Sequence, residues 1–149
     1  ISNAFTAAEY SEQVDFIHRE SRKVAQFFNQ YDVLLTPTAA KPPVPIGEFG
    51  LSKKDVLQIR FLRKFPFRGL IDKALHALAT NAISATPNTM LFNQTGQPAI
   101  SVPLFWNTDD LPIGSQLVGR FGEESTLLQL ARELEIAQPW ANRLPALLQ

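Results

Sequence analysis

Few residues in this chain combine the type and the spacing that catalysis or metal binding requires. The two histidines, His18 and His76, lie far apart in the sequence, and neither belongs to an H-E-x-x-H pattern. Ser101 and Ser115 stand between strand-forming residues and not in the G-x-S-x-G turn that presents a nucleophile. The carboxylates are scattered, and the chain has no cysteine. We therefore predict no catalytic residue, no metal site and no cofactor in this chain.

A basic and aromatic stretch between Lys53 and Lys73 is the one place where an anion could bind. Seven basic residues outnumber two acidic ones there, and they alternate with three phenylalanines, Phe61, Phe65 and Phe67. Such a stretch could contact nucleic acid or lipid headgroups. Phenylalanines that face the core beneath a solvated basic surface explain it better. We therefore predict no nucleic-acid partner and no membrane partner.

Length and composition fit a single folded unit. The 149 residues are 45% hydrophobic and carry a formal net charge of zero, which excludes a disordered chain and gives no long-range field. No apolar run approaches the roughly 18 residues of a membrane span, and the first residues do not resemble a signal peptide. The lack of cysteine is compatible with a reducing compartment, and we expect a cytoplasmic protein.

Two apolar runs near the carboxyl end predict a hairpin. A polar turn built on Asn93, Thr95 and Gly96 precedes a run at 99–106, and a second run follows at 113–118. The polar segment at 107–112 between them is short enough to reverse the chain. Pro103 lies inside the first run, which predicts an edge strand or a bulge there.

The amino-terminal part predicts a long helix followed by a strand. Thr6 to Glu9 has capping-box spacing, and the helix should end near 29–32. Apolar residues recur at helical steps at Tyr10, Val14, Ile17, Val24, Phe28 and Tyr31. The continuously apolar run at 33–35 predicts a strand buried on both faces. Thr36, Pro37 and Thr38 then lie at the carboxyl end of this strand, where open α/β sheets tend to bind ligands. A plain strand-ending turn is the alternative.

The remaining segments predict a loop and three more helices. Prolines and glycines exclude regular structure at 39–50, which we interpret as an internal loop and not as a domain boundary. Helices are predicted from Ser52 to Arg63, from about Arg68 to Ser84, and around 127–137 until Pro139 stops the last one. An apolar tail follows at 144–148. These elements predict an α/β fold with about three strands covered by amphipathic helices.

Several of these segments also carry a family resemblance. The order N-x-x-G-x-P-A-x-S-x-P from Asn93, then L-P-x-G-x-Q-L from Leu111, then the last helix with Pro139-Trp140, resembles the carboxy-terminal part of the amidase signature family. The segment at 31–38 is similar to the Y-D-x-L-L-x-P-T segment of that family. The resemblance extends from about Thr6 to Pro145. Asp110 departs from it, because the family usually has glycine there, and this suggests a different loop conformation.

The resemblance implies a function that this chain would serve only in part. Family members are hydrolases several hundred residues long, in which a serine, a second serine and a lysine transfer the acyl group of an amide. Those residues belong to an earlier segment that this chain lacks. The chain would then be the carboxy-terminal portion of the domain and of its mixed sheet. It would form one wall of the cleft for a small-molecule amide.

The resemblance also suggests which residues face the substrate. The candidates are Thr36, Pro37, Thr38, Met90, Phe92 and Asn93, because they stand where the chain leaves or approaches a predicted strand. Asn93 could instead be a turn residue that bonds its own backbone. A free-standing, non-catalytic binding or assembly module that kept the half-fold is the alternative function. Because neighbouring strands would be absent, we expect the isolated chain to associate with itself.

Overall fold

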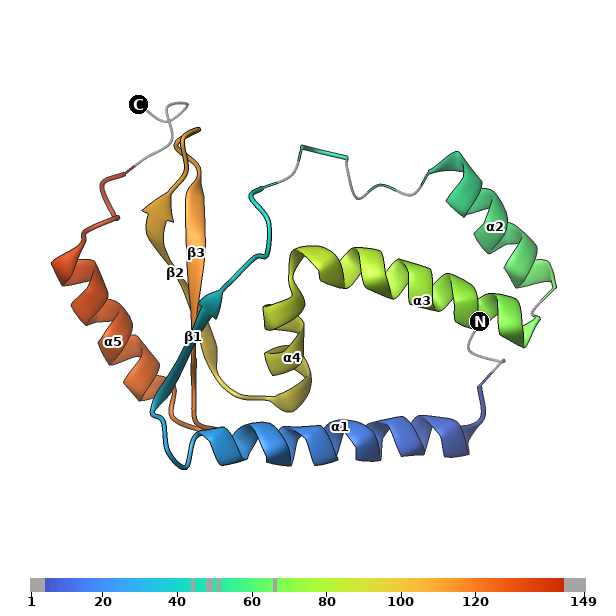
Figure 1. Ribbon diagram of the computed structural model, residues 1–149, viewed down its shortest axis with the longest axis horizontal. Coiled ribbons are helices and arrows are strands. Elements are labelled where there is room, and N and C mark those ends of the chain that lie inside the picture. The colour runs from blue at the N-terminus through green and yellow to red at the C-terminus, as the bar shows by residue number, and fades with distance from the viewer. Residues whose placement is uncertain (1–4, 44, 48–49, 51, 66, 144–149) are drawn as a thin grey trace.

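The computed structural model describes residues 5–43, 45–47, 50, 52–65 and 67–143. The fold contains a small sheet whose three strands are ordered β1-β3-β2, with helices on both sides of the sheet and further helices that extend away from it (Figure 1). In chain order the elements are α1 (Ala7–Phe27), β1 (Val33–Pro37), α2 (Lys53–Lys64), α3 (Arg68–Ala85), α4 (Pro87–Thr95), β2 (Ala99–Trp106), β3 (Pro112–Gly119) and α5 (Glu124–Ala137). The predicted α/β class and the three strands are confirmed. The predicted apolar tail at 144–148 lies outside the described residues.

The predicted hairpin is present as β2 and β3. The two strands pair antiparallel, and the register shifts between Pro103 and Phe105. Pro103 therefore has both predicted features, because β2 is an edge strand and carries an irregularity beside the proline. In the connecting turn Asp110 has φ 58°, the left-handed region that glycine favours. The aspartate thus adopts a backbone conformation that is open to glycine.

β1 pairs antiparallel with the other side of β3. The prediction that this strand is buried on both faces is wrong for this chain, because the Leu35 side chain is 63% exposed. The physical reason is that α5 packs on β2 and β3 and leaves this part of β1 uncovered. The composition of β1 is typical of a strand that is covered on both faces, but the described residues do not cover the Leu35 side chain.

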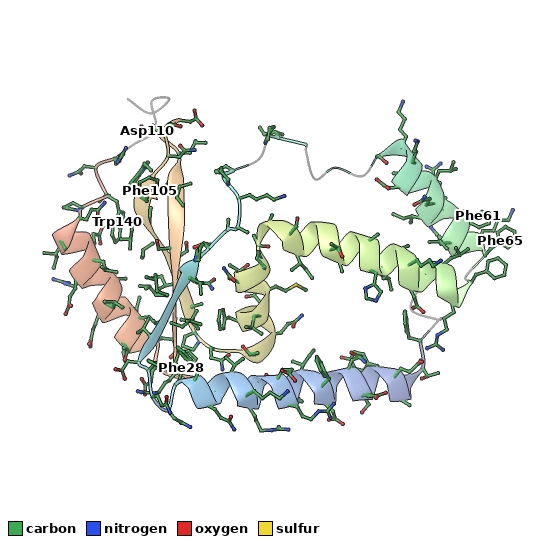
Figure 2. All side chains as sticks on the ribbon, viewed as in Figure 1. Phe28, Phe61, Phe65, Phe105, Asp110 and Trp140 are labelled. Carbon is green, nitrogen blue, oxygen red and sulfur yellow. The ribbon has the colours of Figure 1, made fainter. Side chains whose placement is uncertain are left out.

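Two cores lie on opposite faces of the sheet. On one face Leu117 and Val102 pack against Leu127 and Ala131 of α5, and Trp140 just beyond α5 joins them (Figure 2). On the other face Val118, Phe28 and Phe92 form the second core, at the junction of β3, α1 and α4. Leu117 of the first core and Val118 of the second are adjacent residues of β3, and Val118 is fully buried. β3 is therefore the element that both cores share.

The capping box predicted at Thr6 is confirmed, and Ser52 forms a second capping box at the predicted start of α2. At the second of these, hydrogen bonds between Asp55 and Ser52 hold the pKa of the Asp55 carboxyl below its ordinary value.

The Asn93 turn was predicted wrongly. The chain is helical from Pro87 to Thr95, and Gly96 ends the helix in the left-handed conformation with φ 81°. Only nine residues long, α4 is too short to reveal a clear helical repeat in the sequence.

The phenylalanines of the basic stretch were expected to face the core, and this was also wrong. Phe61, Phe65 and Phe67 are 51%, 43% and 60% exposed, and their rings contact one another. Figure 2 shows Phe61 and Phe65 at the end of the molecule away from the sheet. In α2 only Leu62 is buried among the described residues, so this helix has an apolar surface without cover. No helix in the described ranges is long and apolar enough to cross a membrane.

Arg120, the residue after β3, joins the ends of several elements. Its Nε donates a hydrogen bond of 2.8 Å to the carbonyl oxygen of Phe28, the C-cap of α1. Its Nη2 lies 2.9 Å from Asp32, just before β1, and its Nη1 lies 3.5 Å from Glu123, just before α5. Because a cation is favourable at a helix carboxyl end, this side chain holds α1 against the start of the sheet.

Two adjacent leucines in α5 test the position of the first core. Leu127 is 3% exposed and Leu128 is 62% exposed. We expect Leu127→Ala to lower the free energy of unfolding by about 2–5 kcal/mol, because it leaves a cavity against the sheet. Leu128→Ala should change it by less than about 0.5 kcal/mol. Equal losses for the two variants in chemical denaturation would contradict the orientation of α5.

Candidate functional site

One face of the sheet changes from apolar to polar along its strands. Leu34 and Val118 are opposite each other at the apolar end, under α1 and α4. Two residues further along, Thr36 of β1, Gln116 of β3 and Ser101 of β2 form a single row across all three strands. Side chains two residues apart share a face, so these polar groups continue the same surface. We call Thr36, Thr38, Ser101 and Gln116 the polar strip.

Hydrogen bonds connect the members of the polar strip in two pairs. Gln116 is 3% exposed, and its Nε2 donates to Thr36 Oγ1 at 3.2 Å. Such a bond is needed because a buried amide without a partner is costly. The hydroxyl oxygens of Thr38 and Ser101 lie 2.6 Å apart, and either can be the donor. Gln116 is thus buried in the sheet, whereas Ser101 is exposed.

Gly114 allows the two hydroxyl groups to meet. The backbone N–H of Thr38 donates to the Gly114 carbonyl oxygen at 2.9 Å, which brings the end of β1 onto β3. A Cβ atom on Gly114 would lie 2.5 Å from Ser101 Oγ and 2.7 Å from Thr38 Oγ1. These distances are far shorter than ordinary contacts, so any side chain at this position would displace one of the hydroxyls.

Helix α4 meets the sheet beside the polar strip. Asn88 Nδ2 donates to the Pro37 carbonyl oxygen at 3.0 Å, so the start of α4 is fixed to the end of β1. The two groups of predicted substrate-facing residues, Thr36–Thr38 and Met90–Asn93, therefore lie on elements that touch. Met90 is 39% exposed and Asn93 is also exposed, whereas Phe92 is 4% exposed and lies in the second core. Phe92 serves packing in this structure.

Sequence reasoning missed three residues of this region. Ser101 was interpreted as an ordinary strand residue, and Gln116 and Asn88 were not selected. Ser101 and Gln116 are indeed strand residues, but only the pairing of β3 with both neighbours brings them into one row with Thr36. The alternation of each strand could have shown that they share a face with some other residue. It could not have shown with which one.

The polar strip has the chemistry of a binding surface. Hydroxyl and amide groups donate and accept hydrogen bonds without carrying charge. Among the described residues, no carboxylate, histidine or lysine bonds to Thr38 or Ser101, so none of them activates either hydroxyl as a nucleophile. His18 and His76 are exposed on α1 and α3. The described ranges contain no group of three histidine, cysteine, aspartate or glutamate side chains that could hold a metal ion.

The sequence of this chain matches a known protein family. The family model described as Amidase matches residues 1–128. The chain belongs to the amidase family. Among its relatives, the 6-aminohexanoate-cyclic-dimer hydrolase of Pseudomonas sp. (strain NK87) is 36% identical over 144 residues. That match includes 96% of this chain but 26% of the relative, so the chain spans about a quarter of its length.

Solved structures of amidases agree with the fold. A structure of 6-aminohexanoate cyclic dimer hydrolase superposes with a TM-score of 0.73 at 32% identity, covering 99% of this chain and 28% of that one. A structure of the same hydrolase complexed with substrate gives a TM-score of 0.72 at 35% identity, covering 97% and 27%. Nearly the whole chain therefore corresponds to one segment of a larger amidase fold.

Two glycines test the packing of the polar strip. We expect Gly114→Ala to lower the free energy of unfolding by about 1–3 kcal/mol, because the new methyl group displaces the Thr38 or Ser101 hydroxyl. Gly69→Ala in α3 is the matched control, because a Cβ there meets nothing within 4 Å. That variant should stabilise the helix by about 0.5–1 kcal/mol. Thermal and chemical denaturation measure both, and a harmless Gly114→Ala would contradict the close packing at this position.

Proposed function

We propose that this chain is the carboxy-terminal portion of an amidase signature hydrolase that cleaves non-peptide amide C–N bonds. The family match over residues 1–128 carries the proposal. In the proposed reaction a serine of the remaining segment attacks the amide carbonyl, a second serine relays its proton, and a lysine acts as the base. The C–N bond then breaks, the amine leaves with that proton, and water hydrolyses the acyl-serine to release the acid. The polar strip supports this division of labour, since the described chain offers hydrogen-bonding groups there but no activated nucleophile.

The polar strip and α4 are proposed to form one wall of the substrate cleft. The paired hydroxyls of Thr38 and Ser101 could donate to an amide carbonyl or accept from an amide N–H, which suits the neutral polarity of an amide. Thr36 and Pro37 continue this wall along β1, and Asn93 adds a polar group on α4. Met90 would supply an apolar contact. Phe92 is left out of the wall because it is buried in the second core.

The proposal is tested with a hybrid enzyme. The 6-aminohexanoate-cyclic-dimer hydrolase of Pseudomonas sp. (strain NK87) would carry this chain in place of the segment that it matches. We expect the hybrid to hydrolyse small amides, whereas this chain alone should show no turnover. Hydrolysis by the purified chain that disappears in Ser101→Ala or Ser115→Ala would overturn the proposal, and so would a folded but inactive hybrid. The second outcome would favour a non-catalytic binding module.

Two residues of α4 distinguish the cleft wall from the core in the same hybrid. We expect Met90→Ala to change the ratio of kcat/KM between bulky and small amides by about tenfold, the scale of one or two methylene contacts. Phe92→Ala should leave that ratio unchanged and lower the free energy of unfolding by about 3–5 kcal/mol. A change of selectivity only in Phe92→Ala would reverse the two assignments.

We also propose that the isolated chain associates with itself. Many large apolar side chains are exposed, including Leu35, Phe61 and Phe67, and exposed apolar surface favours association. We expect a dimer or larger species at micromolar concentration in light scattering coupled to size exclusion. A monomer throughout a hundredfold dilution series, with a thermal transition independent of concentration, would contradict this proposal.

A further inference from the structure

One side of α2 exposes apolar side chains at regular steps. Leu57, Phe61 and Phe65 follow one another at four-residue intervals, which places them on the same side of the helix. They are 68%, 51% and 43% exposed, whereas Leu62 is buried. In Figure 2 Phe61 and Phe65 lie at the end of the molecule away from the sheet. Among the described residues, this apolar stripe has no cover.

Basic side chains accompany the stripe. Arg60 and Lys64 directly precede Phe61 and Phe65, and because they are four residues apart they form a neighbouring row. The Lys64 ammonium group lies 5.7 Å from the centre of the Phe65 ring, so it is on this side of the helix. We call Leu57, Arg60, Phe61, Lys64 and Phe65 the α2 face.

The positive charge of α2 is not offset by acidic neighbours. The helix contains five basic residues and one acidic residue, Asp55. The Asp55 carboxylate accepts a hydrogen bond of 2.8 Å from the backbone N–H of Ser52, so it serves the amino end of the helix. Among the described residues, none of the basic side chains of α2 forms an ion pair. The α2 face therefore combines exposed apolar area with uncompensated positive charge.

The apolar surface continues into the start of α3. Phe67 and Leu70 are 60% and 48% exposed. The rings of Phe65 and Phe67 are stacked, with their centroids 6.5 Å apart. Exposed aromatic and aliphatic side chains beside lysine and arginine are typical of helices that lie in the plane of a membrane interface.

We propose that the α2 face docks on the surface of a membrane that contains anionic lipids. The lipid phosphate groups lie against Arg60 and Lys64, and Leu57, Phe61 and Phe65 enter the boundary between the headgroups and the acyl chains. The expectation of no membrane partner rested on phenylalanines that face the core, and the exposed rings remove that reason. The proposal concerns a partner of the protein and does not depend on its amide chemistry.

Charge and side-chain type favour a lipid surface over other occupants. Two copies that met through α2 would bring their basic rows together, and like charges repel. Nucleic acid stacks its bases on aromatic rings, but the rings here already contact one another, and Leu57 and Leu70 have no ring. A protein segment that covered this face would have to supply a partner for each cation that it enclosed. An anionic membrane offers an apolar layer and negative groups together.

Vesicle co-sedimentation tests the proposal. The probes are vesicles of phosphatidylcholine with phosphatidylglycerol, which are anionic, and vesicles of phosphatidylcholine alone, which are neutral. We expect this chain to bind the anionic vesicles at least about tenfold more tightly, because each basic residue near an anionic surface contributes about fivefold. Salt at about 1 M should remove most of this difference, because it shortens the Debye length to about 3 Å.

A phenylalanine on each of two helices tests the apolar part of the contact. Phe61→Gln removes a ring from the α2 face and keeps a residue that favours helices. It should weaken binding to the anionic vesicles about tenfold, the effect of losing the burial of one large apolar side chain. Phe16→Gln in α1 is the matched control, because Phe16 is 49% exposed but lies outside the α2 face. It should leave vesicle binding unchanged.

Two double variants test the charged part. Arg60→Gln with Lys64→Gln should weaken binding to the anionic vesicles by about 10- to 30-fold and change binding to the neutral vesicles little. Arg19→Gln with Arg22→Gln is the matched control, because it removes the same charge from exposed positions of α1. Circular dichroism shows whether each variant folds. If one variant of the α2 face does not fold, the other and the comparison of the two kinds of vesicle decide the question.

The other occupants correspond to different results. Equal binding to the two kinds of vesicle, no binding to either, or equal losses in the α2 and α1 variants would overturn the proposal. It is also overturned if the chain binds single-stranded DNA but not vesicles, or if Phe61→Gln abolishes only self-association. A folded hybrid enzyme that no longer binds anionic vesicles would show that the rest of the amidase domain covers the α2 face. An inactive hybrid that still binds them would contradict the proposed function alone.

Discussion

The pairing of β3 with strands on both of its sides is the constraint on which the rest of the structure depends. Leu117 and Val118 are adjacent, so their side chains enter opposite faces and take part in different cores. Helix α5 needs the first of these cores, and α1 and α4 need the second. A shift of β3 by one residue would exchange the two side chains and turn Gln116 towards α5. The register is therefore fixed by both faces together.

The same register creates the polar surface. Gln116 is buried in the middle strand, and its burial is acceptable only because Thr36 on β1 accepts its hydrogen bond. Ser101 and Thr38 can approach each other because β3 has glycine at the position between them. Gln116, Ser101 and Thr38 thus take part both in the packing of the sheet and in the proposed binding surface. The polar strip exists because three strands place their short polar side chains in one row.

The sequence predicted structural features that depend on neighbouring residues better than features that depend on residues far apart in the chain. The capping box at Thr6, the hairpin and the irregularity at Pro103 each result from neighbouring residues, and all were predicted. The exposure of Leu35 was missed because the composition of a strand reports the burial it is suited to, not the cover available in a given chain. The contact between Thr38 and Ser101 joins residues 63 positions apart, and no single-sequence pattern contains their register.

The position of β1 in the chain has a consequence for the order of folding. β2, β3 and α5 follow one another with short connections, so their contacts close small loops. The hydrogen bond between Gln116 and Thr36 spans 80 residues and encloses α2, α3 and α4 in its loop. Because closing a longer loop costs more entropy, contacts of this kind form later than local ones. A ribosome makes β1 first of the three strands, but β1 has to wait until the hairpin emerges before it can join the sheet.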